Sequence, residues 1–448
     1  MNVFPKIAFN TIIQILGRGV VIGFTIITTI LLTRRLGVAG YGDYVFITAF
    51  LMLFSSIADW GTGIISVREA SRTRKDTKEY RDAKEREKIE KKIYGNALVL
   101  RLITAVLSFL IINLLILILP QFSGLVLPAV IASTLLFFWS LRTSCQIIFQ
   151  TKLRFDQHVL VEIFASGLFV LFLVLVLGFS SSLSLIFLAL SSASLLAAIL
   201  ALILGQRLTG FDLQPDWKLM KRIIKEALPT GALLLVFSVY NRIDIFILQS
   251  LKGAEPVGIY GLAYKIHDNL VLGAAFLANA FFPVISQYGK ISELKKEFEP
   301  MRKIYQKLFD VLFLAGLVMI AFTFVFSPLI IQIIGGREFS ASILTLRILV
   351  LGTFIAYFNH LTGYSLIALG KQKISLIIAV LALAWNIGLN LLLIPRFSYL
   401  AAASITIATE GLVLILTSIY LARKFNLKPA ISFHRTFIEI IKTKGKIF

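Results

Sequence analysis

Long apolar runs, separated by short polar segments, recur along the whole chain. A helix rises about 1.5 Å per residue, so a run of about twenty residues can cross a hydrocarbon layer of roughly 30 Å. Membrane-spanning strands are only about ten residues long and alternate in polarity, so the pattern predicts helices rather than a barrel. We predict twelve transmembrane helices, at residues 7–33, 41–66, 93–119, 125–149, 158–178, 183–205, 227–250, 258–286, 304–334, 343–369, 374–394 and 399–421.

Two pairs of short stretches indicate that the chain contains two copies of one unit. GVAGYGDY and GAEPVGIY match at an offset of 216 residues, through Gly37/Gly253, Gly42/Gly258 and Tyr44/Tyr260. IIFQTKLRF and LIALGKQKI, centred on Lys152 and Lys371, recur at an offset of 219, each between the fourth and fifth spans of its half. In the octapeptides, glycine permits a sharp reversal between two spans, and the tyrosine is expected at the level of the lipid headgroups.

Each predicted copy holds six spans, and this even number brings the second copy into the membrane in the same orientation as the first. We therefore predict an all-α integral membrane fold with two six-helix lobes, related by a pseudo-twofold axis along the membrane normal, around a central cavity. The predicted N-terminal lobe covers residues 1–210 and the C-terminal lobe residues 211–422. A basic, amphipathic cytoplasmic tail is predicted at residues 423–448, with Phe433, Phe437, Ile440 and Ile441 at helical spacing.

Composition supports this class and argues against most others. The 448-residue chain is 58% hydrophobic and only 15% charged, and its mean hydropathy is +0.87, far outside the range of soluble proteins. The single Cys145 excludes a disulfide within the chain and a zinc site with several cysteine ligands, and the four histidines form no short-spaced pair. No segment between spans is long enough for a catalytic domain, so we predict neither an enzyme nor a bound cofactor or metal.

The net charge of +21 lies mainly on one side of the predicted membrane protein. Connecting segments on the side of the N-terminus hold 33 lysines and arginines, against five on the opposite side. By the positive-inside rule both termini are cytoplasmic. The charge therefore predicts contact with anionic lipid headgroups of a cell membrane, and the absence of a basic soluble domain argues against nucleic acid.

Charged residues within the spans need a reason, since a central arginine or aspartate costs roughly 2.5–3.5 kcal/mol on insertion scales. Arg18 and Arg242 are the most deeply placed bases of the two halves, and we predict that they line the cavity and hold an anionic group, together with Lys265 and Arg142. For Arg142, Arg101 and Arg347, pairing with a neighbour or snorkelling is the alternative. The candidates for neutral or aromatic contacts to an uncharged part of the ligand are Gln14, Tyr240, Asn241, Tyr264 and Asn269.

The acidic residues Asp59, Asp244 and Asp268 are candidates for gating or for binding a coupling Na⁺ or H⁺. Asp59 stands in a DWG stretch near the inner end of its span, and a structural or gating role is favoured there. Arg242 and Asp244 are two residues apart and cannot share a helix face, so each is expected to find a partner on another helix. Asn386 and Asn390 share one face of the eleventh span, where hydrogen bonds between helices are favoured over a site.

Several longer motifs resemble a known family over almost the whole chain and in matching order. These are ADWGTGIISVREASR, LGVAGYGDY, ALGKQK and NIGLNLLLIPRFSYLAAASITIATE. They are similar to the polysaccharide transporter branch, the oligosaccharide flippases, of the multidrug/oligosaccharidyl-lipid/polysaccharide (MOP) flippase superfamily. The chain departs from the usual pattern after Pro395, where Leu400 stands before three alanines. The resemblance implies transport of a polyprenyl pyrophosphate-linked oligosaccharide to the outer leaflet by alternating access, with glycan-assembly proteins as partners.

Three other functions stay open from the sequence. A cation-coupled multidrug exporter of the same superfamily would need an acidic cavity, and Asp244 and Asp268 keep it in consideration. A lipid II-type flippase typically has two further C-terminal spans, which the tail does not supply. A membrane-embedded glycosyltransferase would need a sizeable outer loop, and the outer loops here are only a few residues long.

Overall fold

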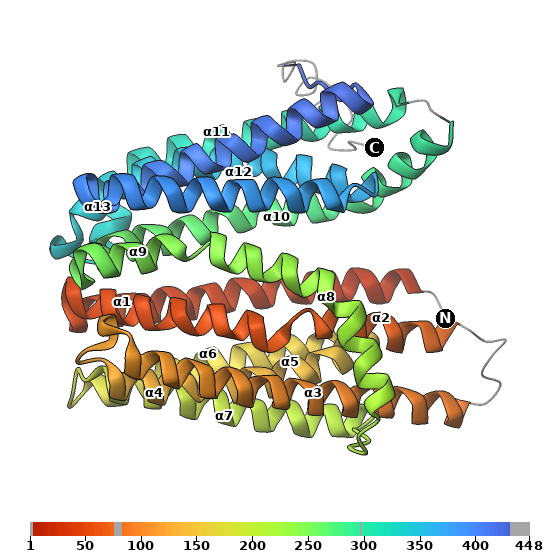
Figure 1. Cartoon of the computed structure of the whole chain (residues 1–448), viewed down its shortest axis with the longest axis horizontal. Coiled ribbons are helices and arrows are strands. Elements are labelled where there is room, and N and C mark those ends of the chain that lie inside the picture. Colours follow the sequence, from red (N-terminus) through yellow and green to blue (C-terminus); the bar gives the residue numbers. More distant parts are fainter. Residues whose placement is uncertain (1–2, 76–82, 296–297, 431–448) are drawn as a thin grey trace. The chain divides into compact units, whose positions relative to one another are not determined.

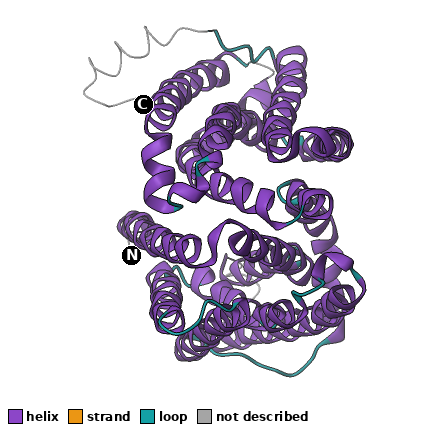
Figure 2. Ribbon diagram, turned by 90° about the vertical axis from the view of Figure 1, so that its left-hand side faces the viewer, coloured by secondary structure: helices purple, strands orange, loops and turns teal. Residues whose placement is uncertain are grey.

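The computed structural model describes residues 3–75, 83–295 and 298–430, and these residues form helices and short connections without a strand (Figures 1 and 2). The chain divides into two compact units, Met1–Arg242 and Ile243–Phe448. The helices of the first unit are α1 (Val3–Asp59), α2 (Thr62–Lys75), α3 (Ala83–Ile118), the 3₁₀ turn η1 (Pro120–Phe122), α4 (Val126–Ser133), α5 (Leu135–Thr151), α6 (Phe155–Leu177), α7 (Leu183–Leu208) and α8 (Trp217–Tyr240).

The second unit is also helical throughout its described part. It consists of α9 (Ile243–Lys252), α10 (Ala254–Lys295), α11 (Glu299–Ile334), the 3₁₀ turn η2 (Arg337–Phe339), α12 (Ala341–Ala368) and α13 (Gln372–Phe425). Within this unit α12 packs against α10, α11 and α13, so it occupies a central position. The predicted amphipathic helix of the tail, with Phe433 and its neighbours, lies outside the described residues.

The long helices have the length and composition of membrane spans. In the described part of the chain, nine helical segments are long and apolar enough to cross a membrane. Two helices exceed one crossing: α1 has 57 residues and α13 has 54, against the twenty or so that a roughly 30 Å layer requires. Each is interrupted by one residue with non-helical torsions, Gly37 in α1 and Ser398 in α13. The all-helical membrane fold is thus confirmed, while the count of twelve spans stays a prediction.

Left-handed backbone residues recur between the two halves at a nearly constant offset, as an internal duplication predicts. The pairs, separated by 212 to 217 residues, are Gly37 (φ 65°) with Gly253 (φ 81°), Gly124 (φ 79°) with Gly336 (φ 84°), Leu153 (φ 55°) with Gly370 (φ 64°), and Gly210 (φ 82°) with Asn426 (φ 52°). The turns η1 and η2 also correspond, and each contains a fully buried phenylalanine, Phe122 and Phe339. The predicted glycine turns and the hinges near Lys152 and Lys371 therefore have matching backbone geometry.

Helices of the first unit pack through small residues and through ion pairs. Ala197 and Ala201 of α7 lie in one buried cluster with Cys145 and Phe149 of α5, and their small side chains let the two helix backbones approach closely.

Two of the predicted arginine pairings can be checked outside the Asp59 region. Arg142 contacts Glu162 of α6. Arg347 of the second unit donates from Nε to Ser327 Oγ at 2.9 Å and stacks on Phe324, so pairing is confirmed for both.

The helix α8 is fixed to the first unit along its length, although the repeat assigns it to the second copy. At its N-terminus, Asp216 accepts hydrogen bonds from the amides of Lys218 and Leu219 at 2.9 and 3.0 Å. Lys92 Nζ lies 2.8 Å from Asp216 Oδ2, and this contact, with the amide bonds, lowers the pKa of Asp216 to about 2. Further along, Arg222 contacts Glu69 of α2 at 3.1 Å. The packing boundary at Arg242 therefore lies later than the boundary of the sequence repeat.

Candidate functional site

The chain breaks between α1 and α2, inside the second predicted span. Trp60 (φ 43°) and Gly61 (φ 73°) are consecutive left-handed residues, a conformation that is strained for a tryptophan. An ideal Cβ on Gly231 of α8 would lie 2.6 Å from the Trp60 carbonyl oxygen, so α8 crosses this break at very short range. The prediction of an unbroken helix over 41–66 is wrong here, because tight packing against α8 holds the two left-handed residues in place.

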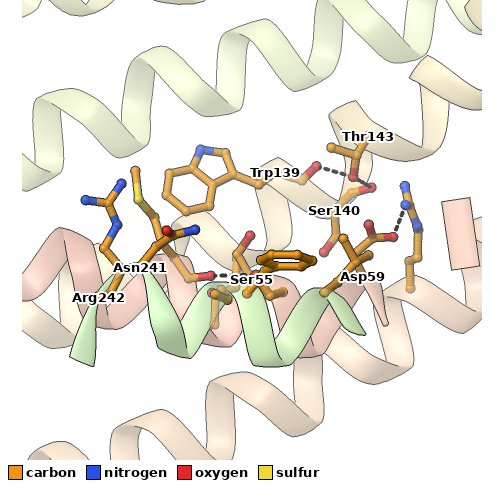
Figure 3. Close-up of a pocket in the computed structure, with 14 residues that line it drawn as sticks. Ser55, Asp59, Trp139, Ser140, Thr143, Asn241 and Arg242 are labelled. Atoms are coloured by element: carbon orange, nitrogen blue, oxygen red, sulfur yellow. Dashed lines mark hydrogen bonds and ion pairs between the residues drawn. The ribbon is translucent and has the colours of Figure 1, made fainter. Parts of the chain in front are cut away.

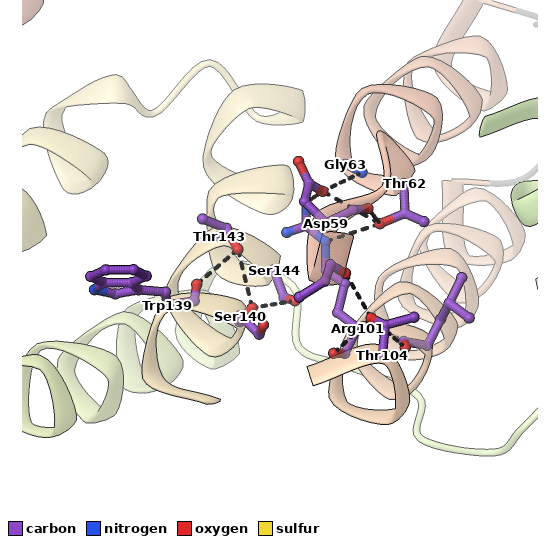
Figure 4. A network of polar contacts seen from close by, with 11 residues as sticks. Asp59, Thr62, Gly63, Arg101, Thr104, Trp139, Ser140, Thr143 and Ser144 are labelled. Atoms are coloured by element: carbon purple, nitrogen blue, oxygen red, sulfur yellow. Dashed lines mark hydrogen bonds and ion pairs between the residues drawn. The ribbon is translucent and has the colours of Figure 1, made fainter. Parts of the chain in front are cut away.

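The break places Asp59 beside Arg101 of α3 (Figure 4). Arg101 Nη2 donates to Asp59 Oδ1, and Arg101 Nε donates to Thr62 Oγ1 at 3.2 Å. An ideal Cβ on Gly63 would lie 2.4 Å from Arg101 Nη2, so the guanidinium rests directly on the backbone of α2. Arg101 is only 3% exposed, yet its Nη1 has no hydrogen-bond partner among the described residues. The pairing expected for Arg101 is confirmed, and one buried donor is left over.

Asp59 and Arg101 line a pocket of about 420 Å³ inside the first unit (Figure 3). This volume lies within the range of roughly 300–1,000 Å³ that is usual for small-molecule sites. The pocket is enclosed by α1, α3, α5 and the C-terminal end of α8. Its lining residues are Met52, Ser55, Ser56, Asp59, Arg101, Leu136, Trp139, Ser140, Thr143, Leu234, Phe237, Ser238, Asn241 and Arg242.

Hydroxyl groups and one indole ring make up much of the wall from α1, α5 and α8. Thr143 Oγ1 donates to the Trp139 carbonyl at 2.8 Å, which leaves its lone pairs as acceptors. The hydroxyls of Ser55, Ser140 and Ser238 make no hydrogen bond within the described part of the chain. The pocket therefore offers unused neutral polar groups inside apolar helices, a combination suited to a hydroxylated ligand.

A second helix break forms the other end of the pocket. Asn241 and Arg242 separate α8 from α9, in the middle of the seventh predicted span. In Figure 3 these two residues lie at one end of the view and Asp59 at the other, with Trp139 between them. Irregular backbone at membrane depth is tolerated where it lines a polar cavity, which accounts for the position of the break. The structure thus brings together Asp59, Asn241 and Arg242 from the predicted set.

The remaining candidates of the first unit lie outside this pocket lining. Arg18 is exposed on α1, one residue after Gly17, which packs closely against Val159 of α6. Gln14 donates to the Asn10 carbonyl at 3.2 Å, one turn away. Arg142 is paired with Glu162, and Tyr240 is half-buried at the end of α8. The cavity roles predicted for Arg18, Gln14, Arg142 and Tyr240 stay predictions.

The candidates of the second unit lie on α9 and α10. Asp244 is buried and accepts hydrogen bonds from Tyr260 Oη and from the Ile245 amide, which confirms the expected partner on another helix. Tyr260 is fully buried, so its ring contacts protein and not lipid, and its expected position at the level of the headgroups stays a prediction. Tyr264 is buried between the rings of Tyr260 and His267. Lys265, Asp268 and Asn269 are half-buried on α10, and their predicted roles stay predictions.

Two further predictions concern hydrogen bonds and metals. Asn386 Nδ2 donates to Thr409 Oγ1 at 3.2 Å across the interruption in α13, which confirms a bond between helical segments. Within residues 3–75, 83–295 and 298–430, no group of three or more His, Cys, Asp or Glu side chains could hold a metal ion.

Sequence reasoning missed most of the pocket wall. Trp139 and the serines and threonine around it carry no charge, so nothing marked them within apolar spans. Arg101 was noticed only as a base near a span end. The signal that could have found the site is the coincidence of Asp59 and Arg101, two opposite charges in neighbouring spans of the same half.

The geometry defines a class: a helical membrane protein with a pocket among its spans that holds charged and hydroxyl-bearing side chains. Solved structures of two-lobe transporters share the fold. A multidrug resistance MATE family transporter of the MOP superfamily, in an inward-facing conformation, matches with a TM-score of 0.67, 16% identity and coverage of 94% of this chain and 96% of that chain. The lipid II flippase MurJ, in an inward closed conformation, matches with a TM-score of 0.70, 14% identity and coverage of 98% and 93%.

Comparison with protein-family models identifies the family. The model described as "Polysaccharide biosynthesis protein" matches residues 7–289, which is more than half of the chain. The chain therefore belongs to the polysaccharide biosynthesis protein family. A second model, MatE, matches residues 229–392.

Among curated proteins the similarity is partial. Capsular polysaccharide biosynthesis protein CapF of Staphylococcus aureus is 26% identical over 191 residues, which cover 42% of this chain and 46% of that protein. A Shigella flexneri protein named as a proposed O-antigen transporter is 26% identical over 175 residues, 38% of this chain and 40% of that protein. The matches thus span less than half the length of these relatives.

Proposed function

We propose that this protein is a flippase that moves a polyprenyl pyrophosphate-linked oligosaccharide from the cytoplasmic to the outer leaflet of the cell membrane by alternating access, without covalent chemistry. The observation that carries the proposal is the pocket of the first unit, with its charged and hydroxyl-bearing side chains, in a chain of the polysaccharide biosynthesis family. Its serines, its tryptophan and its two arginines suit a sugar headgroup that bears phosphate. The name of CapF and the fold shared with the lipid II flippase MurJ support the same substrate class.

The substrate has a polar head that cannot cross hydrocarbon unaided and a tail that can. Guanidinium groups bind phosphate oxygens in bidentate fashion, and Arg242 lines the pocket. Arg18 is proposed to assist from the exposed face of α1, and the polyprenyl tail would stay in the bilayer. The charge bias of the connecting segments supports a cytoplasmic position for both termini, and glycan-assembly proteins are the expected partners. Coupling to Na⁺ or H⁺ remains a proposal, with Asp244 and Asp268 as candidates.

The second candidate function is a cation-coupled multidrug exporter, which the MatE model match and the MATE structural likeness favour. An organic cation needs net negative charge at its site. The pocket lining instead carries two guanidiniums, from Arg101 and Arg242, and one carboxylate, from Asp59. This balance favours an anionic substrate, and a lipid II-type flippase activity would share it.

Transport of a labelled lipid-linked oligosaccharide by the purified protein in vesicles tests the proposal. Wild-type protein should translocate the label, while Arg242→Ala and Arg18→Ala should abolish transport and Lys replacements should retain part of it. Arg396→Ala is the matched control, since Arg396 is exposed on α13 and lies outside the pocket lining. Export of organic cations without movement of the lipid-linked sugar would overturn the proposal in favour of the exporter.

A further inference from the structure

We infer that the pocket of the first unit is a pyranose-binding subsite, in which Asp59 and Arg101 hold neighbouring hydroxyls of one sugar ring and Trp139 packs against the face of that ring. The inference rests on the proposed function, because a lipid-linked oligosaccharide supplies the sugar. The inference specifies the part of the substrate that this pocket recognises and the residues that bind it.

The first argument is an unused donor beside an unused acceptor. Arg101 is 3% exposed, and its Nη1 has no partner among the described residues, although buried polar groups are nearly always hydrogen-bonded. The bonds that Asp59 accepts through its side chain in the described structure all go to Oδ1, which leaves Oδ2 open on a side chain that is 38% exposed. Two adjacent hydroxyls match this pair: one accepts from Nη1 while the other donates to Oδ2.

The pair is also held rigidly before any ligand arrives. The Gly63 amide donates to Asp59 Oδ1 at 3.4 Å, and Thr62 Oγ1 accepts from Arg101 Nε at 3.2 Å. Thr104 Oγ1 donates to the Ala58 carbonyl at 2.6 Å, which ties α3 to the end of α1 (Figure 4). Binding groups that need no reordering lose little entropy when a ligand binds. A positioned carboxylate and guanidinium therefore form a preorganised site for a diol.

The second argument comes from the middle of the pocket, between the ion pair and Arg242 (Figure 3). A pyranose ring has apolar C–H faces and a polar rim, so it needs a flat apolar surface surrounded by hydrogen-bonding groups. Trp139 supplies the flat surface, and the hydroxyls of Ser55 and Ser140 supply part of the surroundings (Figure 3). Ser238 adds a third hydroxyl to the lining. Lipid chains would leave these hydroxyls and Arg101 Nη1 unsatisfied, which disfavours a purely apolar occupant.

Charge sets the direction of the bound head. Asp59 and Arg101 contact each other at one end of the pocket, and the Arg242 guanidinium and the Asn241 amide stand at the other end. A neutral ring fits the end with the ion pair, and an anionic group attached to it, a phosphate or a sugar carboxylate, can accept hydrogen bonds from the donors at the other end. An organic cation is disfavoured, because the lining carries two guanidiniums and a single carboxylate, which also contacts Arg101.

Binding of simple sugars to the full-length detergent-purified protein tests the inference directly. The probes are the methyl glycosides of glucose, N-acetylglucosamine, rhamnose and glucuronic acid, with open-chain sorbitol as the control without a ring face, and saturation-transfer NMR gives the apparent Kd. At least one glycoside should bind, sorbitol should not, and Trp139→Ala should raise the apparent Kd about tenfold through the lost ring contact. Trp385→Ala is the matched control, because Trp385 lies on α13 in the second unit.

Two milder variants guard against a folding defect. Trp139→Phe should bind more weakly than wild type but better than Trp139→Ala, and Ser238→Ala should weaken binding without altering thermal stability. The inference is overturned if no glycoside binds wild type, or if Trp139→Ala binds as wild type does. Its failure is separable from that of the proposed function: a protein that translocates lipid-linked oligosaccharide equally well as wild type and as Trp139→Ala keeps the function and loses the subsite.

Discussion

Removal of one member of the Asp59–Arg101 pair should have unequal consequences for the two members. The Arg101 side chain is 4% exposed and that of Asp59 38% exposed. Asp59→Asn keeps the shape of the side chain but leaves a positive charge buried without compensation, a change that typically costs about 3–5 kcal/mol. Arg101→Met leaves a carboxylate that water reaches, so its cost should be only about 1–2 kcal/mol. The double variant removes both charges and should be within about 1 kcal/mol of wild type.

Thermal unfolding in detergent measures these differences. For a cooperative unit of this size each kcal/mol moves Tm by roughly 2–4 °C, so Asp59→Asn should lower Tm by about 6–20 °C and the double variant by a few degrees at most. Transport should not recover in the double variant, because the groups that bind the sugar are gone. The reasoning is refuted if Arg101→Met is as damaging as Asp59→Asn, or if the effects of the single substitutions add in the double variant.

Two further predictions concern the attachment of α8. Gly231→Ala places a methyl group 2.6 Å from the Trp60 carbonyl oxygen, so it should destabilise the protein by about 1–3 kcal/mol, seen as a lower Tm; Gly388→Ala, which meets nothing within 4 Å in the middle of α13, should not lower Tm. Asp216 has a pKa lowered to about 2, so its stabilising effect is complete above its unfolded pKa near 3.9 and declines as the pH falls through 2. Asp216→Asn should therefore lower Tm more at pH 7 than at pH 2.5. An equal loss of Tm at both pH values would contradict this assignment. The same pH-dependent loss of Tm in the control variant Glu338→Gln would also contradict it.

The fold could be predicted because lipid imposes simple rules on a sequence. A span must be apolar over about twenty residues, and its backbone bonds must close within the helix. The turn glycines were visible for a related reason: Gly37 and Gly253 have positive φ, which glycine adopts without strain. At two other corresponding positions the residue type changes while the torsion persists, with Leu153 matching Gly370 and Gly210 matching Asn426. Matching residue types alone therefore reveal only part of the internal repeat.

The pocket was harder to predict because its parts are ordinary residues in ordinary spans. Charge drew attention to Asp59 and Arg242, and both line the pocket. Trp139 could have been buried among apolar neighbours or could have faced lipid, and only the packing of α5 against α1 and the pocket that it shares with the end of α8 give it a polar environment. The break at Trp60–Gly61 was hidden for another reason, since a left-handed tryptophan is held by contact with Gly231, a residue 171 positions away.

The site-forming features of the first half have no counterpart at matching positions of the second. At the repeat offset of 216, Asp59 corresponds to Ala275, Arg101 to Leu317 and Trp139 to Ile355. The backbone has also diverged there, because α10 runs as one helix through the stretch that matches the break between α1 and α2. Symmetry between the copies survives at the turns and is lost at the pocket. The expected stoichiometry is therefore one sugar ring per chain at this type of site, rather than the two that an exact duplication would offer.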